Sequence, residues 1–245
     1  MKIAYIISAY KLPGQLVRLV KRLNTEDTAF YIHVDKKADD GIYKNIVFSL
    51  ESFHNVSFLP RHKCYWGGYG HIKATFTGIN YALLDDYQYD YIILLTGQCY
   101  PIKSNKEIFQ YLDISDGKSF LNYKMYSVVD KSDRILYWHL GLLRWHFVFP
   151  KKDMFDTPFI NKVWNNLLQV VPIKRKFPEG FTPFWGGSYW CLSREAVNLI
   201  HSFVQNNKSF VNYFKTVYIP DEVFFQTVLM NSYLKDQIID DDLRY

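Results

Sequence analysis

One acidic side chain near the end of the sequence is well placed to move a proton. Residues 219–229 read IPDEVFFQTVL, so Glu222 follows a proline and a second acid and precedes an apolar run. A carboxylate that is held rigidly within reach of a hydroxyl can act as a general base. An acid at the start of a helix also complements the positive end of the helix dipole. Residue type and spacing leave both roles open for Glu222.

The run after Glu222 has the spacing of a helix. Pro220 suits a first helical position, and acidic residues suit a first turn. The spacing i, i+4, i+7, i+11 places four residues on one face of this predicted helix: Val223, Thr227, Met230 and Leu234. We therefore expect Glu222 on the first turn of a packed helix.

A glycine-rich segment precedes this helix. Residues 184–195 read FWGGSYWCLSRE, the pattern of a glycine turn that enters a buried strand. Because side chains alternate along a strand, one of Tyr189 and Trp190 faces a pocket and the other packs in the core. The turn and the acidic helix together suggest a site for sugar transfer.

The first hundred residues alternate between apolar runs and helical spacing. This pattern predicts strands at 3–8, 30–34, 56–59 and 91–95 and helices at 15–23 and 71–84. Such an alternation is typical of an α/β fold with a parallel sheet covered on both faces. Ligands of these sheets gather at the carboxyl ends of the strands, which here are residues 8–11, 35–37 and 96–101.

Composition disfavours several classes of partner. The 245 residues carry a net charge of +5 with scattered basic residues, which disfavours a nucleic-acid partner. The sequence has neither a G-x-G-x-x-G after its first strand nor a P-loop. Its three cysteines have neither zinc-site nor disulfide spacing, and we expect them to be reduced core residues. Residues 113–180 are irregular in pattern and could form a flap that faces an acceptor.

Several motifs resemble, in order, those of a known family, the core-2/I-branching N-acetylglucosaminyltransferases and the related protein O-xylosyltransferases. The matching pieces span nearly the whole chain: YIHVDKK at 31–37, YWGG at 65–68, LLTGQCYPIKSN at 94–105, GGSYW at 186–190, PDE at 220–222, TVL at 227–229 and NS at 231–232. The resemblance implies a GT-A type α/β fold, a nucleotide-sugar-binding sandwich with a mostly parallel central sheet. It also implies inverting transfer of a sugar from a UDP-sugar to a hydroxyl, with Glu222 as the base.

The same resemblance implies a set of donor-binding residues. It places Asp35 near the uridine, and capping of a turn is the alternative role. It places Trp66 in the donor pocket, where a core tryptophan beside a turn is the alternative. Thr227 could contact the donor or bond its own helix backbone. The expected donor contacts are Tyr10, Asp35, Lys36, Trp66, Gly67, Tyr189, Trp190, Thr227 and Arg244.

We expect no metal ion and no other cofactor at the donor diphosphate. Most enzymes of this fold hold a metal with Asp-x-Asp after a central strand, whereas Gly97, Gln98 and Cys99 stand at that strand end. The family likewise works without metal, and Arg244 matches a basic residue that contacts its diphosphate. An Asp-x-Asp pattern does occur at 240–242, but it lies at the far end of the chain, and we expect no metal there either.

No linker or internal repeat divides the chain, so we expect a single GT-A type domain over residues 1–245. The family's second downstream basic residue has no counterpart, which leaves open whether this domain lacks the family's C-terminal segment. With neither a signal peptide nor an apolar run of membrane-spanning length, we expect a cytoplasmic protein with at most peripheral contact at the inner face of the membrane.

The expected substrates are a UDP-sugar and a glycan or lipid-linked acceptor. N-acetylglucosamine and xylose are both open as the transferred sugar, and surface polysaccharide is the expected product. The alternative function is a non-catalytic module of the same fold that binds a nucleotide sugar or a carbohydrate.

Overall fold

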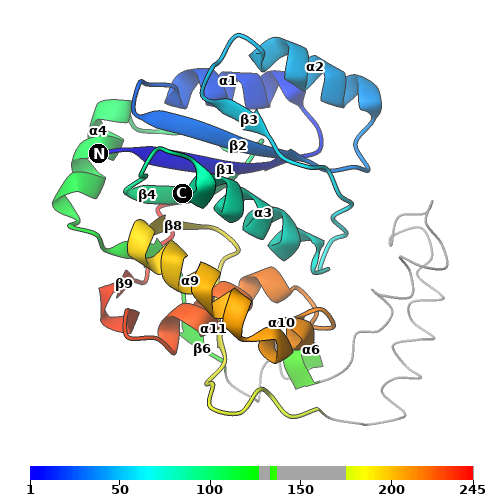
Figure 1. Cartoon of the computed structure of the whole chain (residues 1–245), viewed down its shortest axis with the longest axis vertical. Helices are drawn as coiled ribbons and strands as arrows, with labels where there is room; N and C mark the ends of the chain where they lie inside the picture. The colour runs from blue at the N-terminus through cyan, green and yellow to red at the C-terminus, as the bar shows by residue number, and fades with distance from the viewer. Residues whose placement is uncertain (127–132, 137–174, 245) are drawn as a thin grey trace.

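A seven-stranded sheet forms the centre of the molecule (Figure 1). The computed structural model describes residues 1–126, 133–136 and 175–244, and within these the strand order is β3-β2-β1-β4-β8-β5-β9. The strands are β1 (Ile3–Ala9), β2 (Thr28–Val34), β3 (Val56–Phe58), β4 (Tyr91–Thr96), β5 (Ser119–Leu121), β8 (Trp190–Ser193) and β9 (Ile238–Ile239). A separate ribbon pairs β6 (Lys124–Met125) with β7 (Phe184–Trp185). Most of the predicted flap at 113–180 lies outside the described residues.

Parallel pairing gives β1, β2, β3 and β4 a common carboxyl edge. β1 pairs in parallel with β2, where Ile3 lies opposite Thr28, and with β4, where Ile3 lies opposite Tyr91. β8 runs antiparallel to β4, with Ile93 opposite Cys191. The turn that precedes β8 therefore reaches the carboxyl edge of the parallel strands. The α/β class and the mostly parallel central sheet of a GT-A type fold are confirmed.

Helices cover both faces of the sheet (Figure 1). The helices are α1 (Pro13–Leu23), α2 (Asp40–Leu50) and α4 (Asn105–Ile114) on one face, and α3 (Gly70–Leu84), α9 (Arg194–Asn206), α10 (Lys208–Phe214) and α11 (Phe224–Met230) on the other. Side chains of β1 point alternately to the two faces of the sheet. Tyr5 and Ile7 pack under α1, while Ala4 and Ile6 pack with α3. The strands and helices predicted between residues 3 and 95 are all present.

The first turn of the predicted C-terminal helix differs from the expectation. η2 (Pro220–Glu222) is a 3-10 turn, and the α-helix begins only at Phe224. Val223 between them has φ −127°, which breaks the helical path. Leu234 lies beyond the end of α11 and is not on its face. Glu222 therefore lies on a short turn that leads into the helix, not on the helix itself.

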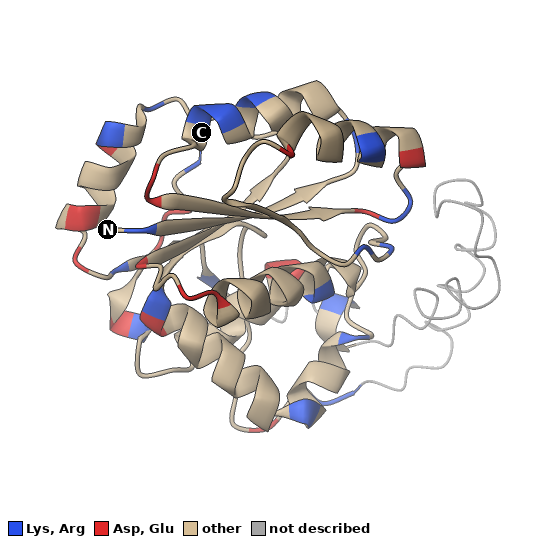
Figure 2. Cartoon of the chain, turned by 45° about the horizontal axis from the view of Figure 1, so that its top comes forward, with Lys and Arg blue, Asp and Glu red and all other residues tan. Residues whose placement is uncertain are grey.

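Positions of both charge signs are spread over the chain (Figure 2). Lys and Arg positions occur together with Asp and Glu positions on several helices and loops, in line with the scattered pattern of the sequence. Within the residues that the structure describes, none of the helices combines the length and the apolar character needed to cross a bilayer.

Candidate active site

Backbone hydrogen bonds tie together the carboxyl ends of β1, β2 and β4. Asp35, just after β2, donates its N–H to the carbonyl of Ala9 (2.8 Å), and Gly97, just after β4, donates to that of Ser8 (2.9 Å). Tyr10 follows β1 at this edge and is exposed. The structure thus joins the three strand ends at which we expected a ligand.

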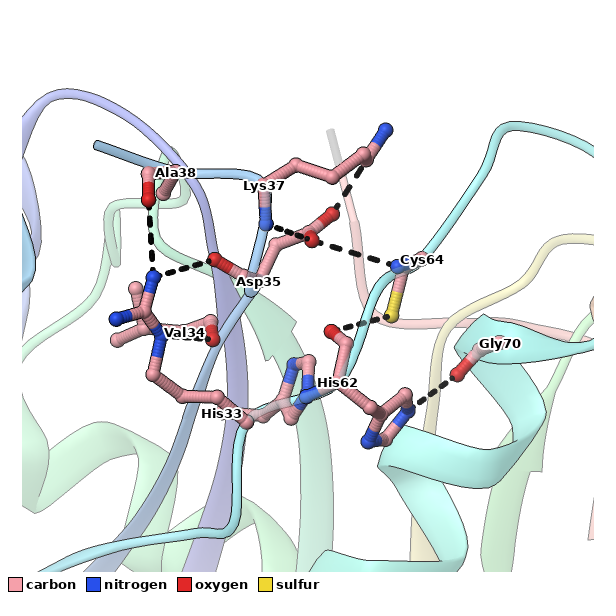
Figure 3. Close-up of polar contacts among 9 residues, drawn as sticks. His33, Val34, Asp35, Lys37, Ala38, His62, Cys64 and Gly70 are labelled. Carbon is pink, nitrogen blue, oxygen red and sulfur yellow. Dashed lines mark hydrogen bonds and ion pairs between the residues drawn. The ribbon is translucent and has the colours of Figure 1, made fainter. Parts of the chain in front are cut away.

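Asp35 lies at the carboxyl edge of the parallel strands and is only 8% exposed. Its Oδ1 accepts hydrogen bonds from the backbone N–H groups of Lys37 (2.8 Å) and Cys64 (3.4 Å), and its Oδ2 lies 4.0 Å from Nζ of Lys37 (Figure 3). The Lys37 ammonium also lies over the Tyr65 ring, 4.6 Å from its centroid. Asp35 therefore caps the turn after β2, and capping through Oδ1 is compatible with a ligand contact at Oδ2.

Arg61, for which the sequence holds no signal, fixes the loop that carries Asp35. Its guanidinium donates to the backbone carbonyls of Val34 (3.3 Å), Asp35 (3.1 Å) and Ala38 (2.9 Å). It also pairs with the carboxylate of Asp40 at 3.0 Å. One side chain thus provides donors for three loop carbonyls.

Trp66 and Gly67 link this edge to the turn that carries Glu222. The Gly67 carbonyl accepts the N–H of Ile219 (2.9 Å), and the Trp66 ring packs edge-on against Tyr218 with centroids 5.5 Å apart. Trp66 is 52% exposed, so it is not the core tryptophan of the alternative interpretation. Gly67 has φ +69°, and a Cβ at this position would lie 2.9 Å from the Tyr218 ring. Only glycine meets both conditions without strain.

The Glu222 carboxylate lies at the rim of the site and is paired with an arginine. Its Oε2 accepts a hydrogen bond from Nη1 of Arg134 (2.8 Å), and both side chains are partly exposed. The Glu222 carbonyl accepts the N–H of Gly186 (2.9 Å), which joins η2 to the glycine turn before β8. Arg134 lies in the short helix α6 (Asp133–Leu136), and its carbonyl accepts the N–H of Tyr218 (3.2 Å). No motif in the sequence marks this arginine.

Tyr189 and Arg244 form a stacked pair beside the end of β4. The Arg244 guanidinium lies 3.5 Å from the centroid of the Tyr189 ring, and Nη2 of Arg244 lies 3.1 Å from Sγ of Cys99. Burial raises the pKa of the Tyr189 hydroxyl, against the opposing effect of the Arg244 charge. A guanidinium held on an aromatic face is suited to bidentate contact with phosphate oxygens. Tyr189 is thus the member of the Tyr-Trp pair that faces the site.

Two of the expected donor contacts lie in the core instead. Trp190 is 1% exposed and packs against Phe225, with ring centroids 5.6 Å apart. Thr227 is fully buried, and its hydroxyl bonds both the N–H (3.1 Å) and the carbonyl (3.2 Å) of Phe184 in β7. Strand alternation explains the first outcome, because Tyr189 takes the outward position. The structure therefore gives both residues a supporting role and does not support direct contact with a donor.

Lys36 does not join the other expected donor residues. Its side chain borders a separate hollow of about 570 Å³ at the β3 edge, together with Tyr43, Pro60 and Tyr81. Its neighbour Lys37 brings the ammonium to Asp35 instead. The alternation of side chains along a strand does not predict which of the two lysines faces the site, because both lie in the turn after β2.

Gln226 positions the glycine turn and was missed by the sequence analysis. It is fully buried in α11, and its Nε2 donates to the carbonyl of Gly187 (2.6 Å). A Cβ at Gly187 would lie 3.1 Å from Oδ2 of Asp242, so the turn also packs closely on the segment before Arg244. A polar side chain within an otherwise apolar helix was the available signal, because buried polar groups need partners.

The acids at 240–242 serve the backbone. Each accepts a hydrogen bond from a main-chain N–H: Asp240 from Tyr123 (2.9 Å), Asp241 from Leu243 (2.8 Å) and Asp242 from Arg244 (3.2 Å). These contacts shape the turn that presents the Arg244 side chain. At the end of β4, the turn made by residues 96–99 contributes no carboxylate of its own.

Comparison with known proteins identifies related sequences. Residues 3–245 match the family model of the Core-2/I-branching enzymes. Human Xylosyltransferase 2 is 27% identical over 251 residues, which cover 100% of this chain and 26% of that protein. The human probable beta-1,3-galactosyl-O-glycosyl-glycoprotein beta-1,6-N-acetylglucosaminyltransferase 7 is 26% identical over 228 residues, which cover 92% of this chain and 49% of that protein. The chain thus spans between a quarter and a half of the length of these relatives.

Solved structures show only a distant likeness. The mannosyltransferase Ktr4p from S. cerevisiae aligns with a TM-score of 0.41 and 10% identity over 96% of this chain and 67% of that chain. The 4-diphosphocytidyl-2C-methyl-D-erythritolsynthase from Anaerococcus prevotii aligns with a TM-score of 0.40 and 13% identity over 85% of this chain and 77% of that chain. The strand order of the sheet, and not these weak alignments, defines the fold.

Proposed function

Because the chain belongs to the Core-2/I-branching enzyme family, we propose that it is an inverting, metal-independent glycosyltransferase. It moves N-acetylglucosamine or xylose from a UDP-sugar to a hydroxyl of a glycan or a lipid-linked oligosaccharide. The observation that carries the proposal is the place of Glu222. Its turn is bonded on one side to Gly67, through Ile219, and on the other side to Gly186. A carboxylate fixed at this junction has the rigid placement that a general base requires.

In the proposed reaction, Glu222 takes the proton of the acceptor hydroxyl. The acceptor oxygen attacks the anomeric carbon from the face opposite to UDP, and a new carbon–oxygen bond forms. The bond to the diphosphate oxygen breaks, and UDP leaves with the electron pair. Arg134 contacts Oε2 of Glu222 at 2.8 Å, and the proposal assigns the proton to Oε1.

At the other end of the donor, positive side chains balance the charge of the leaving diphosphate. We assign this role to Arg244, which Tyr189 and the turn at 240–242 hold in place. Donors placed in advance where charge develops stabilise a transition state without reorganisation. Asp35 and Trp66 are assigned to the nucleoside, since a carboxylate can accept ribose or base hydrogen bonds and an indole can stack on a base.

The proposed biological role is the synthesis of a surface polysaccharide on a lipid-linked acceptor. We place the protein in the cytoplasm, with peripheral contact at the inner face of the membrane where such an acceptor is held. The net charge of +5 is compatible with an anionic surface.

A non-catalytic module that binds a nucleotide sugar or a carbohydrate is the second candidate. The ion pair between Glu222 and Arg134 favours it, because the pair engages the carboxylate that a base must keep available. The fold and the donor-binding residues would be the same in both cases.

Release of UDP separates the two candidates. The purified chain is incubated with UDP-N-acetylglucosamine or UDP-xylose, with and without a panel of glycan and lipid-linked acceptors. Acceptor-dependent release of UDP and a product of inverted anomeric configuration support the enzyme. Saturable binding of a UDP-sugar without release under every acceptor supports the binding module, and the absence of any binding contradicts both.

A further inference from the structure

Three side chains that can bind a metal meet beside Asp35. His33 lies on β2, while His62 and Cys64 lie on the loop that follows β3 (Figure 3). One potential ligand atom from each of the three lies within 4.8 Å of the others. No local motif in the sequence marks this group, because the fold alone brings His33 on β2 close to the distant His62-Lys63-Cys64 segment.

Hydrogen bonds hold both histidine rings in place. His33 is 1% exposed, and its Nε2 accepts the backbone N–H of His62 (3.2 Å), so an ion at this nitrogen would take the place of that hydrogen bond. The His62 ring lies 4.3 Å from the His33 ring, and its Nε2 contacts the carbonyl of Gly70 (2.9 Å). Metal-binding histidines commonly donate their second ring N–H to a backbone carbonyl. His62 has this arrangement, which fixes its ring and leaves its Nδ1 for the ion.

We propose that His33, His62 and Cys64 bind one Zn²⁺ ion that clips the loop after β3 onto the end of β2. Two imidazoles and one thiolate form a ligand set that zinc accepts readily. Ligand atoms of a tetrahedral zinc site lie about 3.3 to 3.8 Å apart, given metal–ligand distances of about 2.0 to 2.3 Å. From the limit of 4.8 Å, the ligand atoms need to approach one another by about 1 to 1.5 Å to reach this geometry. A fourth position remains for a water or a nearby oxygen.

Binding requires the Cys64 thiol to lose its proton. The S–H bond breaks, a Zn–S bond forms, and the proton goes to solvent. The thiolate cancels one of the two positive charges, and the Asp35 carboxylate, whose Oδ1 lies 3.4 Å from the Cys64 backbone nitrogen, offsets the remaining charge. Arg61, Lys37 and Lys73 are basic neighbours that act in the opposite direction.

The ion would stabilise the two segments that carry the proposed donor contacts Asp35 and Trp66. Cys64 precedes Trp66 by two residues, and His33 precedes Asp35 by two residues. An ion that joins Cys64 to His33 therefore fixes the spacing of both donor segments. The ion has no role in contacting the diphosphate, so the proposed metal independence of donor binding is unaffected.

Cobalt titration of the intact, metal-stripped chain tests the site without any substitution. Co²⁺ bound by a thiolate in a tetrahedral site gives strong near-ultraviolet charge-transfer absorption together with visible bands. We expect these bands to saturate at one Co²⁺ per chain and to disappear when one equivalent of Zn²⁺ is added. Zinc at about 100 times its dissociation constant should raise the melting temperature by about 5 to 10 °C.

Two variants locate the ion. Cys64→Ser should abolish the charge-transfer band, and His62→Gln should weaken Co²⁺ binding by at least about 10-fold. His54→Gln is the matched control, because His54 is an exposed histidine outside the group, and it should bind as the unmodified chain does. Circular dichroism checks that each variant is folded. Absence of the charge-transfer band in the unmodified chain, or retention of full binding by Cys64→Ser, would overturn the proposal.

Discussion

At the scale of single residues, the sequence does not reveal the ion-pair partner of the Glu222 carboxylate. Glu222 could be singled out because it stands in a Pro-Asp-Glu motif. Its partner Arg134 lies 88 positions away, and only the fold brings them to 2.8 Å. Alternation predicts that one of Tyr189 and Trp190 faces outward and the other is buried, but it does not say which.

Arg244 provides the first prediction at this scale. Arg244→Ala should weaken UDP binding by about 10- to 100-fold, since a charge-assisted hydrogen bond contributes about 1.5 to 3 kcal/mol. Uridine has no phosphate, so its affinity should change by less than about 2-fold. Isothermal titration calorimetry measures both ligands.

Arg194→Ala is the control for Arg244→Ala. Arg194 begins α9 at the opposite edge of the sheet, where its side chain reaches the carbonyl of Tyr89. Its removal should leave the affinity for UDP unchanged. An equal loss of UDP and uridine affinity in Arg244→Ala would place Arg244 away from the diphosphate.

At the scale of elements, long strands and helices could be predicted, and short ones could not. The pattern of hydrophobic residues locates β1, β2 and β4, because each contains a run of apolar side chains. β5 and β9 have three and two residues, too few to show a period, and they join the sheet only through distant partners. The sequence Pro-Asp-Glu suits the start of an α-helix as well as a 3-10 turn, so the sequence alone does not distinguish the two for η2.

The tether between the Trp66 loop and η2 provides the second prediction. Gly67→Ala places a side chain on a left-handed backbone, which costs about 1 to 2 kcal/mol, and drives its Cβ against the Tyr218 ring. We expect a lower melting temperature and a UDP affinity reduced by at least about 5-fold, measured by thermal unfolding and calorimetry.

Gly14→Ala is the matched control for the tether. A Cβ at Gly14 meets nothing within 4 Å, and the residue lies in α1, where alanine is favoured by about 0.5 to 1 kcal/mol. This variant should be at least as stable as the unmodified chain and should bind UDP normally. Normal UDP binding by Gly67→Ala would show that the tether does not shape the donor site.

At the scale of the whole molecule, fold class was the most predictable property. The alternation of strands and helices over the first hundred residues dictates a parallel sheet with two covered faces, and the edge at which ligands gather follows from that topology. The glycine turn reaches the same edge only because β8 runs antiparallel to β4, a reversal that no local pattern encodes. The group formed by His33, His62 and Cys64 could not be predicted either, because only the fold brings these three residues together.

Metal independence provides the prediction at this scale. UDP affinity should be the same with and without added Mg²⁺ or Mn²⁺, since the turn at the end of β4 contributes no carboxylate to hold a donor metal. Calorimetric titration after removal of divalent ions, followed by addition of each ion in turn, makes the comparison. Recovery by Zn²⁺ alone would indicate the structural ion proposed above, whereas recovery by Mn²⁺ would contradict metal-independent donor binding.

The most direct test of the account is the Glu222→Gln variant, measured for turnover, UDP affinity and melting temperature on the same preparation. Glutamine keeps the size of the side chain but cannot take a proton, so transfer should fall by about 10² to 10⁴-fold while UDP affinity is retained. Glu195→Gln is the control, because Glu195 lies in the first turn of α9, where loss of its charge should cost about 0.3 to 1 kcal/mol of stability and leave turnover intact. If Glu222→Gln behaves like this control, with near-normal transfer, Glu222 is not the base and the proposed mechanism is wrong.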